Sequence, residues 1–194
     1  MARPPEFNRD AVLSAVTQLF WQRGYSSTSV EQIVAAAGIN RATLYASFGG
    51  KAALFEQALQ HYFEPVQRLL GQLQATGAPL RQLQSFFELT LIVLPEAQRQ
   101  LGCLLVNSVC ELAESDAELA ASAGQRLEQV QRQFQQMLEK AHAQGQVQAE
   151  PELLARWLIN VMKGLRVSAR EQMPKEQLQQ MINLTFQGIR HVTL

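Results

Sequence analysis

Four consecutive residues, Asn40, Arg41, Ala42 and Thr43, place an arginine among short side chains directly after a glycine turn. An arginine guanidinium can donate two parallel hydrogen bonds to a guanine, and the methyl groups of alanine and threonine can contact a thymine methyl. Such contacts require the first turn of an exposed helix, because that turn enters the major groove of DNA. The four residues therefore predict base contacts if a helix begins at Asn40.

A second group of polar residues near these positions has the chemistry of phosphate contacts. A tyrosine hydroxyl, a short serine or threonine hydroxyl and a lysine ammonium all bind phosphate oxygens, and such contacts position a protein on DNA without reading its sequence. The residues predicted to make them are Thr28, Ser29, Tyr45, Ser47 and Lys51.

The elements that must position these side chains are two short helices, preceded by a longer one over residues 11–23. The sequence Thr-Ser-Val-Glu at residues 28–31 has the spacing of a capping box, which predicts a helix that ends at Gly38. Asn40 is a favourable N-cap for the next helix, which runs to Phe48. Two short helices joined by a glycine turn, the second exposed at its start, form a helix-turn-helix.

Other reactive side chains do not assemble into a catalytic or metal-binding pattern. The three histidines, His61, His142 and His191, are isolated from one another and from any spaced cysteine, aspartate or glutamate set. The run Gly-Gly-Lys at residues 49–51 lacks the further glycine and the serine or threonine of a nucleotide phosphate loop. We therefore predict no metal, no cofactor and no enzymatic activity. The alternative, a helical enzyme or carrier, has no titratable cluster or cofactor motif to support it.

Composition narrows the class of protein further. The 194 residues include 17 basic and 17 acidic side chains and carry a formal net charge of zero, so bulk charge does not indicate a nucleic-acid partner. Residues 1–51 hold five basic and three acidic residues, so any DNA binding must depend on a shaped reader. Two cysteines, no signal-peptide pattern at the start and no apolar run longer than residues 89–94 predict a cytoplasmic protein without membrane contact.

Helical periodicity continues through the rest of the chain. Apolar residues recur at three- and four-residue spacing, and no stretch of alternating β-branched residues indicates a strand. Even the glutamine-rich stretch 125–148 keeps this spacing and is predicted to be an amphipathic helix. Glycine and proline breaks divide the chain into about nine helices. The predicted fold class is all-α.

The region around the helix-turn-helix resembles the DNA-binding region of the TetR/AcrR family of transcriptional regulators. The resemblance implies an N-terminal DNA-binding domain, residues 1–51, and a helical effector-binding and dimerisation domain, residues 52–194. It also implies a repressor that binds double-stranded, palindromic operator DNA as a homodimer and is released by a small-molecule effector. Ser47 stands where the family often has histidine or tyrosine. The matching residues are Leu19-Phe20, Gly24-Tyr25, Thr28-Ser29-Val30, Ile33-Val34, Ala36-Ala37-Gly38-Ile39, Arg41-Ala42-Thr43-Leu44-Tyr45, Phe48 and Lys51-Ala52-Ala53-Leu54.

An effector pocket in the second domain should be mostly apolar with a few polar anchors. Asn107 and Asn160 stand among apolar neighbours, where each amide needs a hydrogen-bond partner in the protein, in water or in a ligand. The candidate lining residues are Phe86, Phe87, Thr90, Leu91, Cys103, Val106, Asn107, Cys110, Phe134, Met137, Trp157, Asn160 and Val161.

The last two predicted helices, about residues 151–171 and 174–192, each carry an apolar face. Two such helices from each chain can form a four-helix bundle across a two-fold axis. The residues predicted to form this dimer interface are Leu154, Trp157, Leu158, Val161, Leu165, Leu178, Met181, Ile182, Thr185, Phe186 and Ile189.

The two cysteines leave an alternative mode of sensing open. Seven residues of helix separate Cys103 from Cys110 by about 10 Å along the axis, which exceeds the ~7 Å limit between the Cα atoms of a disulfide. The segment Gly102-Cys103-Leu104 resembles one in oxidant- or electrophile-sensing members of the family, which implies that Cys103 alone acts as a sensor. The competing interpretation is a small buried cysteine that only fills space.

Overall fold

The computed structural model of the chain describes residues 7–75 and 77–192, and it contains helices and no strand within these ranges. Nine of these helices have eight residues or more, and α6 adds a single turn. Residues 1–6, at the start of the predicted DNA-binding domain, lie outside the described residues. The helices are α1 (Arg9–Arg23), α2 (Val30–Ala37), α3 (Arg41–Phe48), α4 (Lys51–Gln74), α5 (Pro79–Leu91), α6 (Glu96–Arg99), α7 (Leu104–Leu112), α8 (Ala117–Ala143), α9 (Pro151–Arg170) and α10 (Lys175–Gly188).

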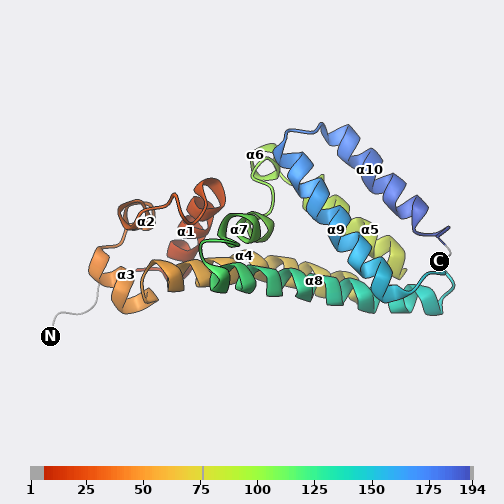
Figure 1. Cartoon of the computed structure of the whole chain (residues 1–194), viewed down its shortest axis with the longest axis horizontal. Helices are drawn as coiled ribbons and strands as arrows, with labels where there is room; N and C mark the ends of the chain where they lie inside the picture. The colour runs from red at the N-terminus through yellow and green to blue at the C-terminus, as the bar shows by residue number, and fades with distance from the viewer. Residues whose placement is uncertain (1–6, 76, 193–194) are drawn as a thin grey trace.

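Helices α1, α2 and α3 pack with the beginning of α4 into a small head at one end of an elongated molecule (Figure 1). Phe20, Ile33 and Leu44 are fully buried at its centre. The ring of Phe20 lies 4.8 Å from the ring of Phe55 on α4, in an edge-to-face arrangement. Because α2 and α3 have only eight residues each, tertiary packing of this kind must hold them in place.

The body is built on the long helices α4 and α8, which run side by side along the molecule (Figure 1). Helices α5, α7 and α9 pack on α8, and α10 packs outside them on α5 and α9. Four phenylalanines close the core between α5, α8 and α10. The rings of Phe86 and Phe134 are 5.5 Å apart, and those of Phe87 and Phe186 are 5.2 Å apart. Burial of each such ring contributes about 1.5–3 kcal/mol to folding.

Two further connections join the head to the body besides the continuous helix α4. The carboxylate of Glu111, on α7, accepts hydrogen bonds from the backbone amides of Tyr25 and Ser26, at 3.1 and 2.7 Å. The guanidinium of Arg126, buried on α8, forms an ion pair with Glu56 of α4 at 2.7 Å. A displacement of α7 or α8 is therefore transmitted to the head through polar contacts as well as through packing.

No single helix in the described ranges is long and apolar enough to cross a membrane; α5 and the segment Glu96–Leu112 reach that length and composition only together, across a 100° bend. In the same ranges no three histidine, cysteine, aspartate or glutamate side chains lie close enough to hold a metal ion. His61 instead shares a hydrogen bond with the hydroxyl of Ser14 at 3.1 Å.

Candidate DNA-binding surface and effector cavity

The turn between α2 and α3 has the geometry of a helix-turn-helix. Gly38 ends α2 with φ of 64°, in the left-handed region that favours glycine. The amide of Ile39 donates to the carbonyl of Val34 at 3.2 Å. Asn40 then caps α3, since its side-chain oxygen accepts a hydrogen bond from the Thr43 amide at 2.8 Å. The predicted helix-turn-helix is confirmed.

The capping box of α2 lies one residue later than predicted. Ser29 is the N-cap: its hydroxyl accepts from the Gln32 amide at 3.2 Å, and the Gln32 side chain accepts from the Ser29 amide at 2.9 Å. Thr28 is fully buried, and its hydroxyl donates to the carbonyl of Gly24 at 2.6 Å. The prediction that this hydroxyl contacts a phosphate is therefore wrong. Ser29 remains exposed.

Helix α3 has one buried face and one exposed face. Leu44 and Phe48 are buried and hold the helix in the head. Its first turn presents the residues predicted to contact bases, of which Thr43 is half-buried and the others are exposed. Ala46 is exposed as well, which sequence reasoning missed although it lies one helical turn after Ala42. The exposed residues of this surface are Asn40, Arg41, Ala42, Tyr45, Ala46 and Ser47.

Arg41 has a partner that the sequence analysis did not identify. Its guanidinium forms an ion pair with the carboxylate of Glu31, on α2, and both side chains are largely exposed. The Glu31 backbone amide and then the Ser29 hydroxyl lower the pKa of the Glu31 carboxyl, with Arg41 contributing less. An exposed ion pair stabilises a protein little. The pair thus orients Arg41 in the free protein and can be exchanged for a base.

The start of α4 adds a phosphate-binding feature beside α3. Gly50 is its N-cap, with φ of 94° and no side-chain cap, so the first backbone amides of α4 stay open to an anion. The ammonium of Lys51 lies 4.2 Å from the centre of the Tyr25 ring; burial lowers the pKa of Lys51, and the Glu111 carboxylate opposes that shift. Lys51, Tyr45 and Ser47 stay predicted phosphate contacts. The open amides were missed, although two glycines before Lys51 signal an uncapped start.

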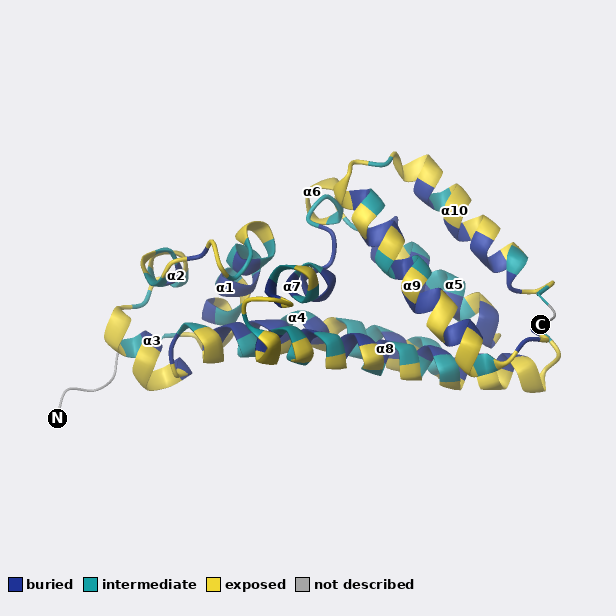
Figure 2. Ribbon diagram, viewed as in Figure 1, coloured by how far each residue is buried: buried dark blue, intermediate teal, exposed yellow. Residues whose placement is uncertain are grey.

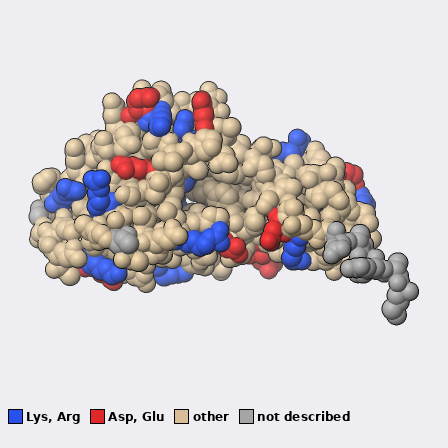
Figure 3. Space-filling model, turned by 180° about the vertical axis from the view of Figure 1, so that it is seen from behind, with Lys and Arg blue, Asp and Glu red and all other residues tan. Residues whose placement is uncertain are grey.

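Charged side chains of both signs are interspersed over the face of the molecule shown in Figure 3, with no large area of one sign. This pattern agrees with the formal net charge of zero. Because bulk attraction is weak, binding to DNA must depend on local shape and on specific contacts.

The chain matches known families over both its head and its body. Residues 12–58 match the family described as bacterial regulatory proteins, tetR family, and residues 79–184 match the tetracyclin repressor-like C-terminal domain. The chain belongs to the TetR family. The family resemblance of the helix-turn-helix region is thereby confirmed and extends to the body.

Individual members of the TetR family are similar to the chain along nearly its full length. The HTH-type transcriptional repressor ComR of Escherichia coli (strain K12) is 30% identical over 188 residues, covering 95% of this chain and 90% of ComR. The repressor DhaR of Mycobacterium sp. (strain GP1) is 30% identical over 193 residues, covering 97% and 94%. A cysteine mutant of the TetR family regulator CifR, solved with 26-base-pair operator DNA, is 25% identical with a TM-score of 0.86, covering 97% and 100%.

A cavity of 460 Å³ lies between the head and the body, at α1, α4, α5, α6 and α9. This volume falls in the range of about 300–1,000 Å³ that is typical of small-molecule sites. Burial, and then the Cys103 thiol, raises the pKa of Tyr62, while Arg166 opposes this shift, so Tyr62 lines the cavity as a neutral phenol. The lining residues are Ser14, Thr17, Gln18, Trp21, His61, Tyr62, Pro65, Val66, Leu69, Leu89, Thr90, Leu94, Gln98 and Arg166.

Of the predicted effector-pocket residues only Thr90 lines this cavity. The three phenylalanines predicted for the pocket, Phe86, Phe87 and Phe134, contact one another instead. Helical spacing identified their buried faces correctly, but it does not distinguish a face that meets a cavity from one that meets a neighbouring side chain. The predicted pocket residues that are buried in the core instead are Phe86, Phe87, Leu91, Cys103, Val106, Phe134 and Met137.

The two predicted amide anchors also lie away from the cavity. The side-chain amide of Asn107 donates to the carbonyl of Leu101 at 2.9 Å, so the protein itself supplies its partner. Asn160 is exposed on α9. Trp157 is also exposed, and Val161 is half-buried on the same helix. None of these four side chains lines the cavity.

The two cysteines differ in exposure. Cys103 is the N-cap residue of α7 and is buried, with the Tyr62 hydroxyl as a hydrogen-bond neighbour. Cys110 is exposed. A thiol that reacts with oxidants must be accessible, so the burial of Cys103 favours the space-filling interpretation over the sensor.

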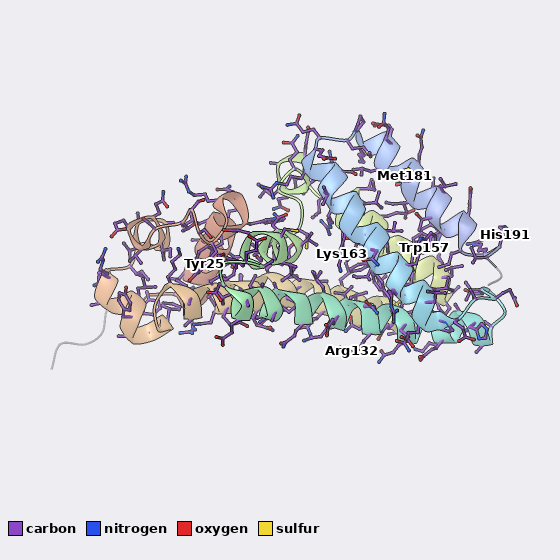
Figure 4. All side chains as sticks on the ribbon, viewed as in Figure 1. Tyr25, Arg132, Trp157, Lys163, Met181 and His191 are labelled. Carbon is purple, nitrogen blue, oxygen red and sulfur yellow. The ribbon has the colours of Figure 1, made fainter. Side chains whose placement is uncertain are left out.

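The faces of α9 and α10 that the sequence analysis assigned to the dimer interface are mostly used within the single chain. Trp157 and Met181 are 39% and 45% exposed and do lie on the outer surface, where Figure 4 labels both, and Val161 is half-buried. The other predicted interface residues are buried in the core of one chain, which corrects their assignment. They are Leu154, Leu158, Leu165, Leu178, Ile182, Thr185, Phe186 and Ile189.

A second apolar surface on the same two helices was missed. Leu153 and Val167 on α9 and Leu184 on α10 are 44%, 46% and 62% exposed. Together with Trp157 and Met181 they form what we call the outer face of α9 and α10, and Figure 2 shows the exposed positions along both helices. Large apolar side chains gathered on a surface are typical of a protein interface.

Proposed function

We propose that the chain is a transcriptional repressor that binds a palindromic operator as a homodimer and is released by a small-molecule effector. The observation that carries this proposal is the exposed first turn of α3, held by buried Leu44 and Phe48 beside the uncapped start of α4. Membership of the TetR family and similarity to regulators named as repressors support it. The proposal places the protein in the cytoplasm, where the DNA lies, and assigns it no catalytic step.

The DNA-contacting residues of each head divide into those that contact bases and those that contact phosphates. Arg41, Ala42 and Thr43 contact base edges, and Ser29, Tyr45, Ser47 and Lys51 contact phosphates together with the open amides of α4. Arg41 must leave Glu31 to reach a guanine, and the loss is small because both side chains are exposed.

The outer face of α9 and α10 is the proposed dimer interface. Its apolar side chains are Leu153, Trp157, Val167, Met181 and Leu184. Pairing this face with its copy buries apolar surface and forms a four-helix bundle on a two-fold axis. The same axis relates the two copies of α3, which must be about 34–36 Å apart to enter successive major grooves.

The cavity between head and body is the proposed effector site. Four of its lining residues, Ser14, Thr17, Gln18 and Trp21, belong to α1 of the head, and the remaining residues belong to the body. A ligand there contacts both parts at once, so its affinity depends on how the head is oriented. Such differential affinity is what allows a ligand to shift a conformational equilibrium.

A second route joins the cavity to the head through α7. The backbone carbonyl of Arg166 lies close to Gly102, and Cys103 next to it begins α7. Glu111 near the other end of α7 holds the Tyr25–Ser26 amides. The domain boundary at residues 51 and 52 remains a proposal, since α4 runs continuously from Lys51 into the body.

The test is the substitution Arg41→Ala, with an operator first selected from genomic fragments by the parent protein. We expect operator binding to weaken by about 1–3 kcal/mol, roughly six- to 150-fold, in a gel-shift titration, with no change in Tm. Arg132→Ala is the matched control, because Arg132 is an exposed arginine of α8 in the body that pairs with the exposed Glu128. Equal affinity of the Arg41 and Arg132 variants for the operator would contradict the proposal.

A further inference from the structure

Arg166 is a buried charge for which the described part of the chain supplies no counterion. Its side chain lines the cavity from α9, and the residue is only 7% exposed. Arg126 on α8 is buried to a similar degree, 9% exposed, but it forms an ion pair with Glu56. Across the described ranges the Nε atoms of both arginines lack a hydrogen-bond partner, but Arg166 also has no ion pair. The cavity lining includes no aspartate or glutamate.

A second polar group of the cavity also lacks a partner. Trp21, on α1, has its ring edge-to-face with Tyr62 at 5.1 Å, and its indole Nε1 is buried without a hydrogen-bond acceptor. An indole nitrogen can only donate. Two residues that line the cavity, Arg166 and Trp21, therefore each hold a donor atom without an acceptor, and none of the lining residues is an aspartate or glutamate.

Burying an unpaired charge or donor is unfavourable, and proteins normally supply a partner. A ligand that carries an acceptor and one negative charge satisfies both groups at once. The rest of the cavity surface includes Val66, Leu69, Leu89 and Leu94, which favour an apolar body. One guanidinium balances one charge, which favours a monoanion over a doubly charged phosphate ester.

We propose that the effector is a small monocarboxylic acid with an apolar body, bound with its carboxylate on Arg166 and Trp21. The apolar body lies along Val66, Leu69 and Leu89. This inference rests on the proposed function for the choice of cavity and adds the chemical class of the ligand. Because Trp21 belongs to the head and Arg166 to the body, the carboxylate also bridges the two parts that the effector must reorient.

Two matched pairs of probes test the ligand class: octanoate with octanamide, and 4-phenylbutyrate with its amide. Each pair has the same apolar body and differs in charge, and the two bodies differ in shape. We expect titration calorimetry on the full chain to give saturable binding of at least one carboxylate, roughly ten- to hundredfold tighter than its amide, because charge-assisted hydrogen bonds are the stronger ones.

Three variants locate the carboxylate. Arg166→Met should abolish the preference for acid over amide, and Trp21→Phe, which keeps a ring but removes the donor, should reduce it several-fold. Arg170→Met is the matched control, since Arg170 is an exposed arginine one turn later on α9, and it should keep the full preference. The Tm of ligand-free Arg166→Met should equal or exceed that of the parent, because an unpaired buried charge is removed.

Several outcomes overturn the inference: no carboxylate binds, acids and amides bind equally, or Arg166→Met keeps the preference for acids. If Arg166→Met does not fold, the preference of Trp21→Phe for acid over amide is measured in its place, and an unchanged preference overturns the inference. A separate gel shift with the binding acid tests the proposed function. If the acid binds as described but the operator stays bound, the effector role is wrong and the ligand class stands. If a neutral compound releases the operator and no acid binds, the ligand class is wrong and the effector role of the cavity stands.

Discussion

The substitution Glu111→Ala removes the polar contact that joins α7 to the head. Its carboxylate oxygens accept from the Tyr25 amide at 3.1 Å and the Ser26 amide at 2.7 Å. Both amides belong to the loop between α1 and α2, just before the helix-turn-helix. The variant leaves both donors without this acceptor and leaves the buried apolar residues of α7 unchanged.

The size of the effect follows from the exposure of the two donors. A hydrogen bond to a charged group contributes about 1.5–3 kcal/mol when it is protected from water. Ser26 is exposed and water can replace the carboxylate there, whereas Tyr25 is half-buried and loses more. We therefore expect the free energy of unfolding to fall by about 1.5–3 kcal/mol in total, which lowers the Tm by roughly 3–12 °C for a chain of this size.

Calorimetric unfolding of the parent, Glu111→Ala and Glu114→Ala measures this change. Glu114 is exposed in the turn that follows α7, so its substitution removes the same charge and should change stability by less than about 0.5 kcal/mol. Glu111→Ala should also reduce the ratio of operator affinities without and with effector, since one connection to the head is lost. Identical Tm values for the two variants would refute the assignment of Glu111 as a link.

The remaining predictions concern the dimer interface and Tyr62, the tyrosine that lines the cavity. Leu184→Asp, on the outer face of α9 and α10, should leave the chain folded but shift sedimentation at micromolar concentration from dimer to monomer, because an unpaired charge in an apolar interface costs several kcal/mol. Phe186→Asp should instead lose the helical circular dichroism signal, since Phe186 is 2% exposed within one chain. The pKa of Tyr62 is raised above its ordinary value of 10.0 in the folded chain. Its contribution to stability is therefore fully present below pH 10 and is lost as the pH rises above 10, where the unfolded chain releases the proton first. Urea unfolding of Tyr62→Phe should therefore show a smaller decline in stability above pH 10 than the parent.

The architecture of the head was predictable because local rules decide it. Gly38 must adopt a positive φ, Asn40 must cap α3, and Leu44 and Phe48 must face inward at helical spacing. The one-residue error at the start of α2 has a physical cause. Thr28 and Ser29 both carry a hydroxyl that can cap a helix, and the choice depends on whether Thr28 reaches Gly24 across the preceding turn.

The body was predictable as helices but not as surfaces. Periodicity shows that α9 and α10 each have an apolar face, and it places Leu158 and Phe186 on those faces. It does not show whether such a face meets its own chain or a second copy, and here the stronger face meets its own chain. The interface that we propose uses the weaker set, Trp157, Met181 and Leu184, which are separated in sequence by polar residues and carry little periodic signal.

The cavity was unpredictable for a related reason: its residues come from five helices that are separated in sequence, and two of its polar groups are distinguished by having no partner among the described residues. In the sequence Arg166 and Arg126 are equivalent arginines on amphipathic helices, and only the fold gives Glu56 to one of them. The unpaired charge of Arg166 at the junction of head and body makes the ligand-free protein less stable than the protein with a bound anion. In the proposed mechanism a ligand that supplies the partner binds one orientation of the head more tightly than the other. By linkage, operator DNA would then lower the affinity for that ligand by the same factor by which the ligand lowers the affinity for DNA. A tenfold release requires about 1.4 kcal/mol of such differential binding, which is within the range of a single charge-assisted hydrogen bond.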